Sequence, residues 1–227
     1  MLSRLSTRFI RTIVPSVGIT PRFMSGAAVT KLHNIIKTEQ QMEKEQYEQM
    51  TTIKKFLDTA PQWKFTDKDG EVTLKLSRSM EDKDVIVEWQ LASPFGNDMG
   101  DLNEEGAEAQ DEEDIPMEST DFTITIQDKS GEKGLMYYCQ TAAGEGHRYM
   151  IGNVRSFASA AERDSDASYN GPDFEDLDDT LQESFDEFLA EAGISDEVCD
   201  FVDATAVDKE QREYMRWLKN VDSFIQA

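Results

Sequence analysis

The sequence predicts an α+β fold in which one antiparallel sheet of about seven strands lies between an N-terminal helix and two C-terminal helices. Apolar residues recur at helical spacing near both ends of the chain, and they alternate with polar residues in its middle third. Strands grouped together, with helices grouped at the ends, favour antiparallel pairing. With 227 residues, 38% of them hydrophobic, the chain is long enough for a single domain with a buried core.

Residues 1–25 are predicted to be a mitochondrial presequence. They contain four arginines and no acidic residue. On a helix, three of these arginines fall on one side, while Leu2, Leu5 and Phe9 fall on the other. An Arg-rich, acid-free amphipathic segment is typical of mitochondrial import signals, and the alternative is a disordered basic tail. We therefore expect a protein of the mitochondrial matrix, with residues 26–227 forming a single acidic domain. No apolar run is long enough to predict a membrane span.

The segment from about residue 27 to 57 is predicted to form one helix, since its apolar residues have helical spacing and no Gly or Pro interrupts it before Pro61. From Trp63 the hydrophobic period changes to two. Strands are predicted at "VTLKL", "VIVEWQL", "FTITI", "LMYYCQTA" and "HRYMIGNVRSF". Asp69-Gly70 and Ser130-Gly131 have the composition of hairpin turns, which join antiparallel neighbours.

One connection within the sheet is long and acidic. Residues 96–121 contain eleven acidic residues and few large apolar ones. Such a segment cannot bury enough surface to offset the entropy lost on ordering. We predict a mobile acidic loop.

The last third of the chain is predicted to be helical. Pro172 suits the first residue of a helix, and Gly193 suits its left-handed C-terminal cap, with Ile194 folding back onto the helix. Ser195 is placed to cap the final helix, which continues almost to the end of the chain.

No catalytic, cofactor or metal site is predicted. "TDKDGEV" resembles a calcium loop, but Phe65 and Leu76 occupy positions where an EF-hand needs acidic ligands. Neither His33 nor His147 lies near a cysteine at zinc-ligand spacing, and no nucleophile motif occurs.

Two cysteines and one aspartate are nevertheless chemically notable. Cys139 and Cys199 lie in different predicted elements and are expected to be buried, reduced thiols. On a helical wheel Asp178 lies beside Phe174 and Phe185, on the apolar side of its predicted helix. A structural hydrogen bond or ion pair and a role as a catalytic acid or base both remain open for Asp178.

The outstanding feature is negative charge. The formal net charge is −23, and two tracts without Lys, Arg or His, residues 84–128 and 164–208, hold fourteen and sixteen acidic residues. The tracts could simply keep the protein soluble. A concentrated negative surface would also attract cationic partners. The candidate partner-binding acids are Asp173, Glu175, Asp176, Asp179, Glu183, Asp186, Glu187, Glu191, Glu104, Glu105, Asp111, Glu112, Glu113 and Asp114.

These acids favour basic proteins as partners. Direct nucleic-acid binding is not expected, because the chain after the presequence lacks a basic patch. A different class of function, buffering of divalent cations at low affinity by clustered carboxylates, is the alternative.

Basic residues return in the two end helices, among them Lys209, Arg212, Arg216 and Lys219. Asp208 and Arg212 have the spacing of a helical ion pair. The end helices also carry large apolar residues that suit packing against each other and against neighbouring subunits. The candidates for subunit packing are Leu32, Ile35, Tyr214, Trp217, Leu218, Val221 and Phe224.

The segments "YNGPDFEDLDDTLQESFDEFLAEAGI" and "DKEQREYMRWLKNVDSFI" make the chain resemble the mitochondrial acidic matrix protein family, also called the mitochondrial glycoprotein family. The resemblance implies a strongly twisted sheet of seven antiparallel strands and a doughnut-shaped homotrimer with one strongly negative face. It also implies no catalytic activity. Family members are similar to adaptors or chaperone-like regulators of basic proteins that support mitochondrial RNA maturation, translation and ribosome assembly. The family has no fixed catalytic residues, so the acids named above come from the charge pattern.

Overall fold

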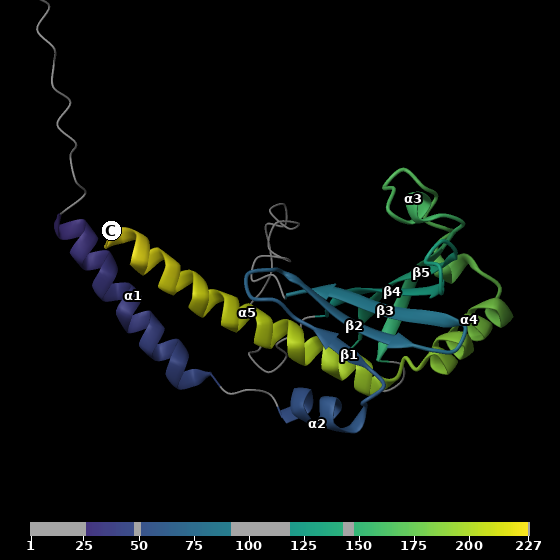
Figure 1. Ribbon diagram of the computed structural model, residues 1–227, viewed down its shortest axis with the longest axis horizontal. Helices are drawn as coiled ribbons and strands as arrows, with labels where there is room; N and C mark the ends of the chain where they lie inside the picture. The colour runs from purple at the N-terminus through teal and green to yellow at the C-terminus, as the bar shows by residue number, and fades with distance from the viewer. Residues whose placement is uncertain (1–25, 48–50, 92–118, 143–147, 227) are drawn as a thin grey trace, which may run out of the picture.

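The computed structural model describes residues 26–47, 51–91, 119–142 and 148–226. The predicted presequence, most of the predicted acidic loop and His147 lie outside these residues. The helices are α1 (Ala27–Gln46), α2 (Thr51–Thr59), α3 (Ala160–Arg163), the 3-10 turn η1 (Phe174–Asp176), α4 (Asp179–Ala192) and α5 (Asp196–Ile225). The strands are β1 (Lys64–Thr66), β2 (Thr73–Ser79), β3 (Lys83–Gln90), β4 (Asp121–Asp128), β5 (Gly134–Thr141) and β6 (Tyr149–Phe157) (Figure 1).

The six strands form one sheet in which each strand pairs antiparallel with the next along the chain. Gly70 and Gly131 have positive φ angles in the β1–β2 and β4–β5 turns, where both hairpin turns were predicted. The predicted antiparallel α+β class is therefore confirmed. The described part of the chain contains six strands, and the predicted seventh is not among them.

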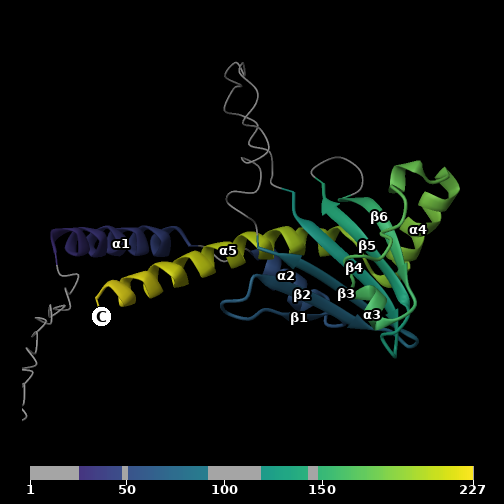
Figure 2. The same cartoon turned by 90° about the horizontal axis from the view of Figure 1, so that it is seen from above.

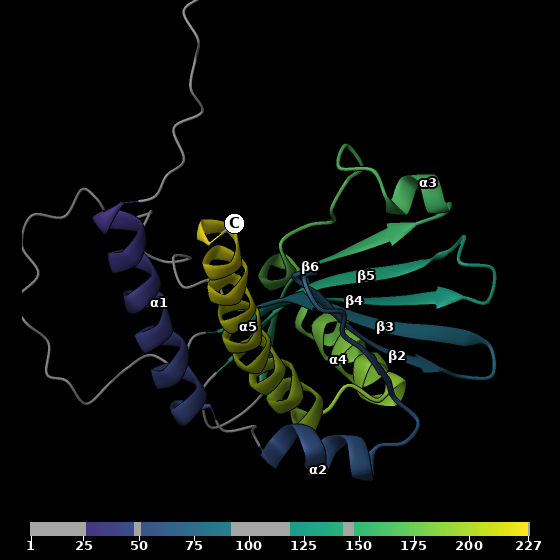
Figure 3. The same cartoon turned by 60° about the vertical axis from the view of Figure 1, so that its left-hand side comes forward.

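The core lies between one face of the sheet and the helices α2, α4 and α5. Leu76, Val87 and Ile124 of the sheet are fully buried, as are Leu189 of α4 and Phe201 of α5. The two cysteines belong to this core and are free, which confirms the prediction of buried thiols. Figures 1 and 3 show α4 and the first half of α5 on this face, with the short helix α3 beyond the other face.

The second half of α5 extends beyond the sheet and lies beside α1, so that the two helices form an arm (Figures 1 and 2). On α1, Ile36 is buried. Polar contacts also join α1 to α5. The Asp222 carboxylate binds His33 Nδ1 at 2.5 Å and Lys37 Nζ at 3.0 Å. The Tyr214 hydroxyl donates to Glu39 at 3.2 Å.

The prediction of one helix from residue 27 to 57 is wrong. The chain leaves the helical conformation at Tyr47, with φ −65° and ψ 117°, and α2 begins at Thr51. Packing explains the division. The α2 residue Phe56 stacks on Phe201 in the core, with 4.4 Å between the ring centroids, whereas α1 packs on the distant half of α5.

The predicted helix start at Pro172 is also wrong. Gly171 lies against β6, since a Cβ atom there would be 2.1 Å from the carbonyl oxygen of Val154. Asp173 forms a β-bridge with Asn153 of β6. The chain then makes the separate turn η1, and α4 begins only at Asp179. Attachment to the edge of β6 therefore overrides the helix signal of Pro172.

The predicted end of the same helix is confirmed. Gly193 adopts the left-handed conformation, with φ 92° and ψ 21°, and the Ile194 N–H donates to the Leu189 carbonyl at 3.0 Å. Ile194 is buried. Ser195 occupies the cap position of α5 as predicted, but its hydroxyl donates to the Glu197 carboxylate and makes no capping bond to the backbone.

Candidate functional site

The outer face of α4 carries a row of carboxylates. Asp179, Glu183, Glu187 and Glu191 follow one another at four-residue intervals, which places them along one side of the helix. All four are exposed, as are Asp173, Glu175 and Asp176 at η1. In the described part of the chain, none of these seven carboxylates forms an ion pair. We call the seven residues the α4 acidic face.

Two groups of predicted partner-binding residues are placed differently. Asp186 is half-buried on the inner side of α4. Burial, followed by the nearby Asp186 carboxylate, raises the pKa of Tyr149. The loop acids Glu104, Glu105, Asp111, Glu112, Glu113 and Asp114 lie outside the described residues.

A cation from the sheet lies at the negative end of α4. Arg78 Nη1 donates to the Ala192 carbonyl at 3.4 Å, and the guanidinium carbon lies 6.0 Å from the centroid of the Trp63 ring. Glu187 and Glu191 are unfavourable at this end of a helix, by about 0.3–1 kcal/mol each. The positive charge of Arg78 at this end opposes that cost, although in the described residues it forms no ion pair with either glutamate.

Four other acids of the tract at residues 164–208 form ion pairs: Asp164, Asp200, Asp203 and Asp208. Arg148 binds Asp200 at 2.9 Å and Asp203 at 3.2 Å, which attaches the start of β6 to α5. Arg212 binds Asp208 at 2.7 Å, as the helical spacing predicted. The structure therefore divides a tract that looks uniform in sequence, and most of its acids without an ion pair in the described residues lie at η1 and α4.

Asp178 is a helix cap. Its carboxylate accepts the Thr180 N–H at 3.0 Å and is exposed. Hydrogen bonds from the Thr180 side chain and backbone lower the pKa of Asp178. A general acid at neutral pH needs the opposite, a desolvated carboxylate with a raised pKa. The predicted place of Asp178 beside Phe174 and Phe185 on one apolar stripe is wrong, because Phe174 belongs to the separate turn η1.

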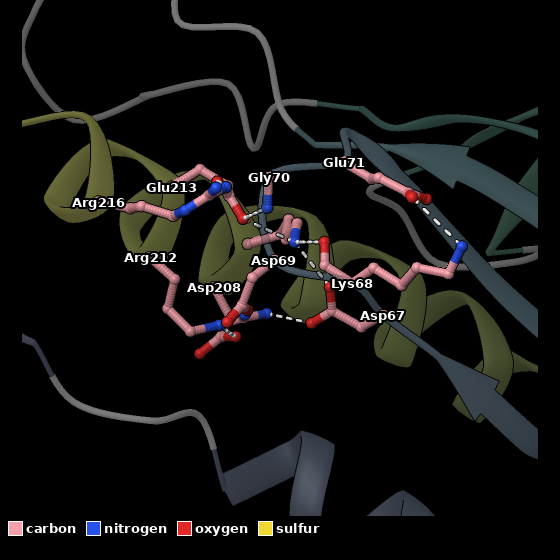
Figure 4. A network of polar contacts seen from close by, with 10 residues as sticks. Asp67, Lys68, Asp69, Gly70, Glu71, Asp208, Arg212, Glu213 and Arg216 are labelled. Carbon is pink, nitrogen blue, oxygen red and sulfur yellow. Dashed lines mark hydrogen bonds and ion pairs between the residues drawn. The ribbon is translucent and has the colours of Figure 1, made fainter. Parts of the chain in front are cut away.

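A buried polar network at the β1–β2 hairpin was missed by the sequence prediction (Figure 4). The Lys209 side chain is 0% exposed, and its Nζ donates to Asp67 Oδ1 at 2.7 Å, to the Lys68 carbonyl at 2.7 Å and to Glu213 Oε1 at 2.9 Å. Glu213 also accepts the Gly70 N–H at 2.7 Å. The available signal was the four-residue spacing of Lys209 and Glu213. Lys209 and Arg212, which the sequence identified only as basic residues of an end helix, therefore hold the hairpin on α5.

The arm exposes large apolar side chains. Leu32 and Ile35 of α1 are 44% and 54% exposed, and Trp217 and Phe224 of α5 are 57% and 81% exposed. Leu218 differs from the other predicted subunit-packing residues, because it is buried within its own chain. Tyr214 and Val221 are half-buried.

The antiparallel sheet, the two C-terminal helices packed on it and the unpaired acidic helix define an acidic α+β protein without an evident catalytic centre in the described residues. The chain belongs to the mitochondrial glycoprotein family, whose MAM33 model matches residues 32–225. It is accordingly a mitochondrial protein.

Two relatives have similar sequences. The chain is 27% identical to the mitochondrial acidic protein mam33 of Schizosaccharomyces pombe over 166 residues, which cover 69% of this chain and 61% of the relative. It is 26% identical to an uncharacterized mitochondrial protein of Arabidopsis thaliana over 164 residues, which cover 72% of this chain and 62% of the relative. The matches therefore span about six-tenths of each relative.

Two solved structures share the fold. A hypothetical protein from Leishmania major, described as a homologue of human p32, superposes with a TM-score of 0.65 at 21% identity and covers 88% of this chain and 99% of its own. The Trypanosoma brucei p22 protein superposes with a TM-score of 0.65 at 20% identity and covers 88% and 100%. Among the described helices of our chain, none is long and apolar enough to cross a membrane.

Proposed function

We propose that this protein is a non-enzymatic adaptor or chaperone-like regulator in the mitochondrial matrix. Its partners are basic proteins of the RNA-binding or ribosomal kind, and binding them supports mitochondrial RNA maturation (processing or editing), translation or ribosome assembly. The observation that carries the proposal is the α4 acidic face, whose seven exposed carboxylates form no ion pair in the described residues. The family membership supports it.

The physical basis is electrostatic attraction between this face and cationic side chains. Grouped carboxylates of one sign raise the local potential and speed the encounter with a cationic partner. Because these carboxylates form no ion pair in the described residues, a partner does not have to break such a pair to reach them. Any effect on RNA is then indirect, through the bound protein.

We also propose that the protein is a homotrimer assembled through the arm. Leu32, Ile35, Trp217 and Phe224 expose apolar surface that a second copy would remove from water. A trimer would present three α4 acidic faces in one particle, which increases avidity for partners with several basic segments.

Affinity capture from mitochondrial extract, with the purified protein as bait, tests the proposed function. We expect the captured proteins to be enriched in basic RNA-binding or ribosomal proteins. They should be retained at low ionic strength and released at high salt, because exposed charges are screened within about 10 Å at 0.1 M salt. A set of captured proteins without basic enrichment, or capture indifferent to salt, would contradict the proposal.

The alternative of a divalent-cation buffer gains no support from the described residues. In the part of the chain that the structure covers, no three His, Cys, Asp or Glu side chains gather closely enough to hold a metal ion. Calcium prefers six to eight oxygen ligands at one site.

A further inference from the structure

A groove of about 330 Å³ lies where α4 meets the ends of two β-hairpins. Ile126, Leu135 and Phe188 supply its apolar lining, and Lys83 and Lys133 lie at the hairpin ends. Its volume is at the lower end of the range for ligand pockets. The groove is separate from the α4 acidic face, but residues of α4 contribute to both.

Phe188 lies at the boundary between the core and the acidic face. Successive residues of an α-helix are about 100° apart around its axis. Leu189, on one side of Phe188, is fully buried in the core, whereas Glu187 and Glu191 are exposed to water. Phe188 itself is half-buried. A side chain that entered the groove would therefore lie next to two unpaired carboxylates.

The opposite rim of the groove, formed by the hairpin ends, carries both acidic and basic residues. Lys83 pairs with Asp82. The Asp128 carboxylate accepts hydrogen bonds within the β4–β5 turn, from the Ser130 hydroxyl at 2.8 Å and from the Glu132 N–H at 3.1 Å. Lys133 has no ion-pair partner in the residues that the structure describes. Two lysines and two aspartates thus balance on the hairpin side, and the excess negative charge beside the groove comes from Glu187 and Glu191 of α4.

We propose that this groove receives one large aliphatic or aromatic side chain of the basic partner segment. Lys or Arg residues on one side of that side chain would lie over Glu187 and Glu191. The inference rests on the proposed function and names the chemistry of the partner. Charge attraction alone discriminates poorly among basic proteins, whereas a buried apolar anchor surrounded by polar contacts typically provides much of the binding energy. The preferred partner is therefore a basic segment with an apolar anchor.

Two synthetic peptides test this inference by fluorescence anisotropy with the full-length protein. Both are twelve residues long and rich in Lys and Arg, with equal charge, and they differ in a central Leu or Ala. We expect the Leu peptide to bind about tenfold more tightly, which corresponds to about 1.4 kcal/mol. Phe188→Ala should bring the two affinities together. The matched control Leu181→Ala, which removes an exposed apolar residue of α4 that does not line the groove, should preserve the ratio.

A second measurement needs no variant, so it stands even where Phe188→Ala impairs folding. A photoreactive diazirine leucine at the centre of the peptide should cross-link to Ile126, Leu135 or Phe188 in the unmodified protein. Equal affinity for the two peptides, or cross-links elsewhere, would overturn the inference. A change in the sedimentation of Phe188→Ala with an unchanged affinity ratio would also overturn it, because the groove would then be a contact between copies.

These outcomes are separate from failure of the proposed function. If neither peptide binds at low salt, the proposed function and the inference both fail. If both peptides bind equally and salt releases both, only the inference fails.

Discussion

Lys209 holds the β1–β2 hairpin to α5, because it binds carboxylates of both elements at a position closed to water. Its ammonium group is completely buried between Asp67 and Glu213. Substitution Lys209→Met keeps the length of the side chain but leaves two carboxylates without their shared cation. Removing one partner of a buried ion pair typically costs about 3–5 kcal/mol. We expect a loss of about 3 kcal/mol in the free energy of unfolding, measured by urea denaturation.

The control for this variant is Lys219→Met on the same helix. Lys219 is exposed and has no ion-pair partner among the described residues. Its substitution should change the free energy of unfolding by less than about 0.5 kcal/mol. Equal effects of the two substitutions would show that the network does not stabilise the fold.

Glu213 in the same network makes stability depend on acidity. Burial opposes ionisation, but bonds from the Gly70 N–H, Lys209 and Arg216 outweigh it and lower the pKa of Glu213 from 4.5 to about 2. A lowered pKa contributes stability that is complete above pH 4.5 and is lost as the pH falls toward about 2. The free energy of unfolding should therefore fall in this window. In Glu213→Gln the fall should be shallower, and an unchanged slope would contradict this assignment.

Gly193 is a residue whose role the sequence predicted correctly, and its structural environment adds a second constraint. Any other residue there would have to adopt the left-handed backbone conformation, and its Cβ atom would lie 2.0 Å from Arg78 Nη1. The conformation alone costs about 1–2 kcal/mol for most residues. We expect Gly193→Ala to lower the free energy of unfolding by at least about 1 kcal/mol. Gly152→Ala, at an exposed position of β6, is the control, since its Cβ atom would meet only the Tyr138 carbonyl at an ordinary 3.5 Å. Thermal denaturation of both variants would distinguish the two environments.

At the scale of helices and strands, local patterns predicted which elements exist better than where they begin. Alternation of apolar residues located β2 through β6, and the Asp69-Gly70 turn located the first hairpin. Pro172 did not start a helix, because Gly171 and Asp173 contact the edge of β6. This contact joins separate parts of the chain, so no local sequence pattern predicts it. The same limit applies to the site. The spacing of Glu183, Glu187 and Glu191 is local, but the cation Arg78 at the end of α4 comes from β2.

The arm is the element whose attachment is easiest to test. Ile36 of α1 is buried, whereas its neighbour Ile35 is 54% exposed. Truncation of a buried Ile typically costs 2–5 kcal/mol, about the whole local stability of a peripheral helix. Ile36→Ala should therefore increase amide hydrogen exchange throughout α1 and leave α4 unchanged. Ile35→Ala is the control for packing within the chain, and it should leave exchange in α1 close to that of the unmodified protein when both are compared as monomers.

At the scale of the whole molecule, paired and unpaired acids lie in different places. Asp67, Asp200, Asp203, Asp208 and Glu213 form ion pairs that join α5 to the sheet or lie along α5, whereas the seven carboxylates of the α4 acidic face are exposed and form no ion pair in the described residues. The arm, which exposes apolar residues, projects away from the sheet (Figure 2). This separation is compatible with the proposed roles of the α4 acidic face in binding a partner and of the arm in contacting other copies.

The most direct test of the central claim compares two variants with the same net charge. One carries Glu183→Gln, Glu187→Gln and Glu191→Gln on α4, and the other carries Glu45→Gln, Asp58→Asn and Glu81→Gln at exposed positions elsewhere. Affinity for a Lys- and Arg-rich peptide is measured at low salt by fluorescence anisotropy. We predict that the α4 variant binds at least about tenfold more weakly than the unmodified protein, a loss of about 1.4 kcal/mol, and that the control variant binds almost as well. Equal weakening in both variants would contradict a specific α4 binding face and reduce the attraction to net charge alone.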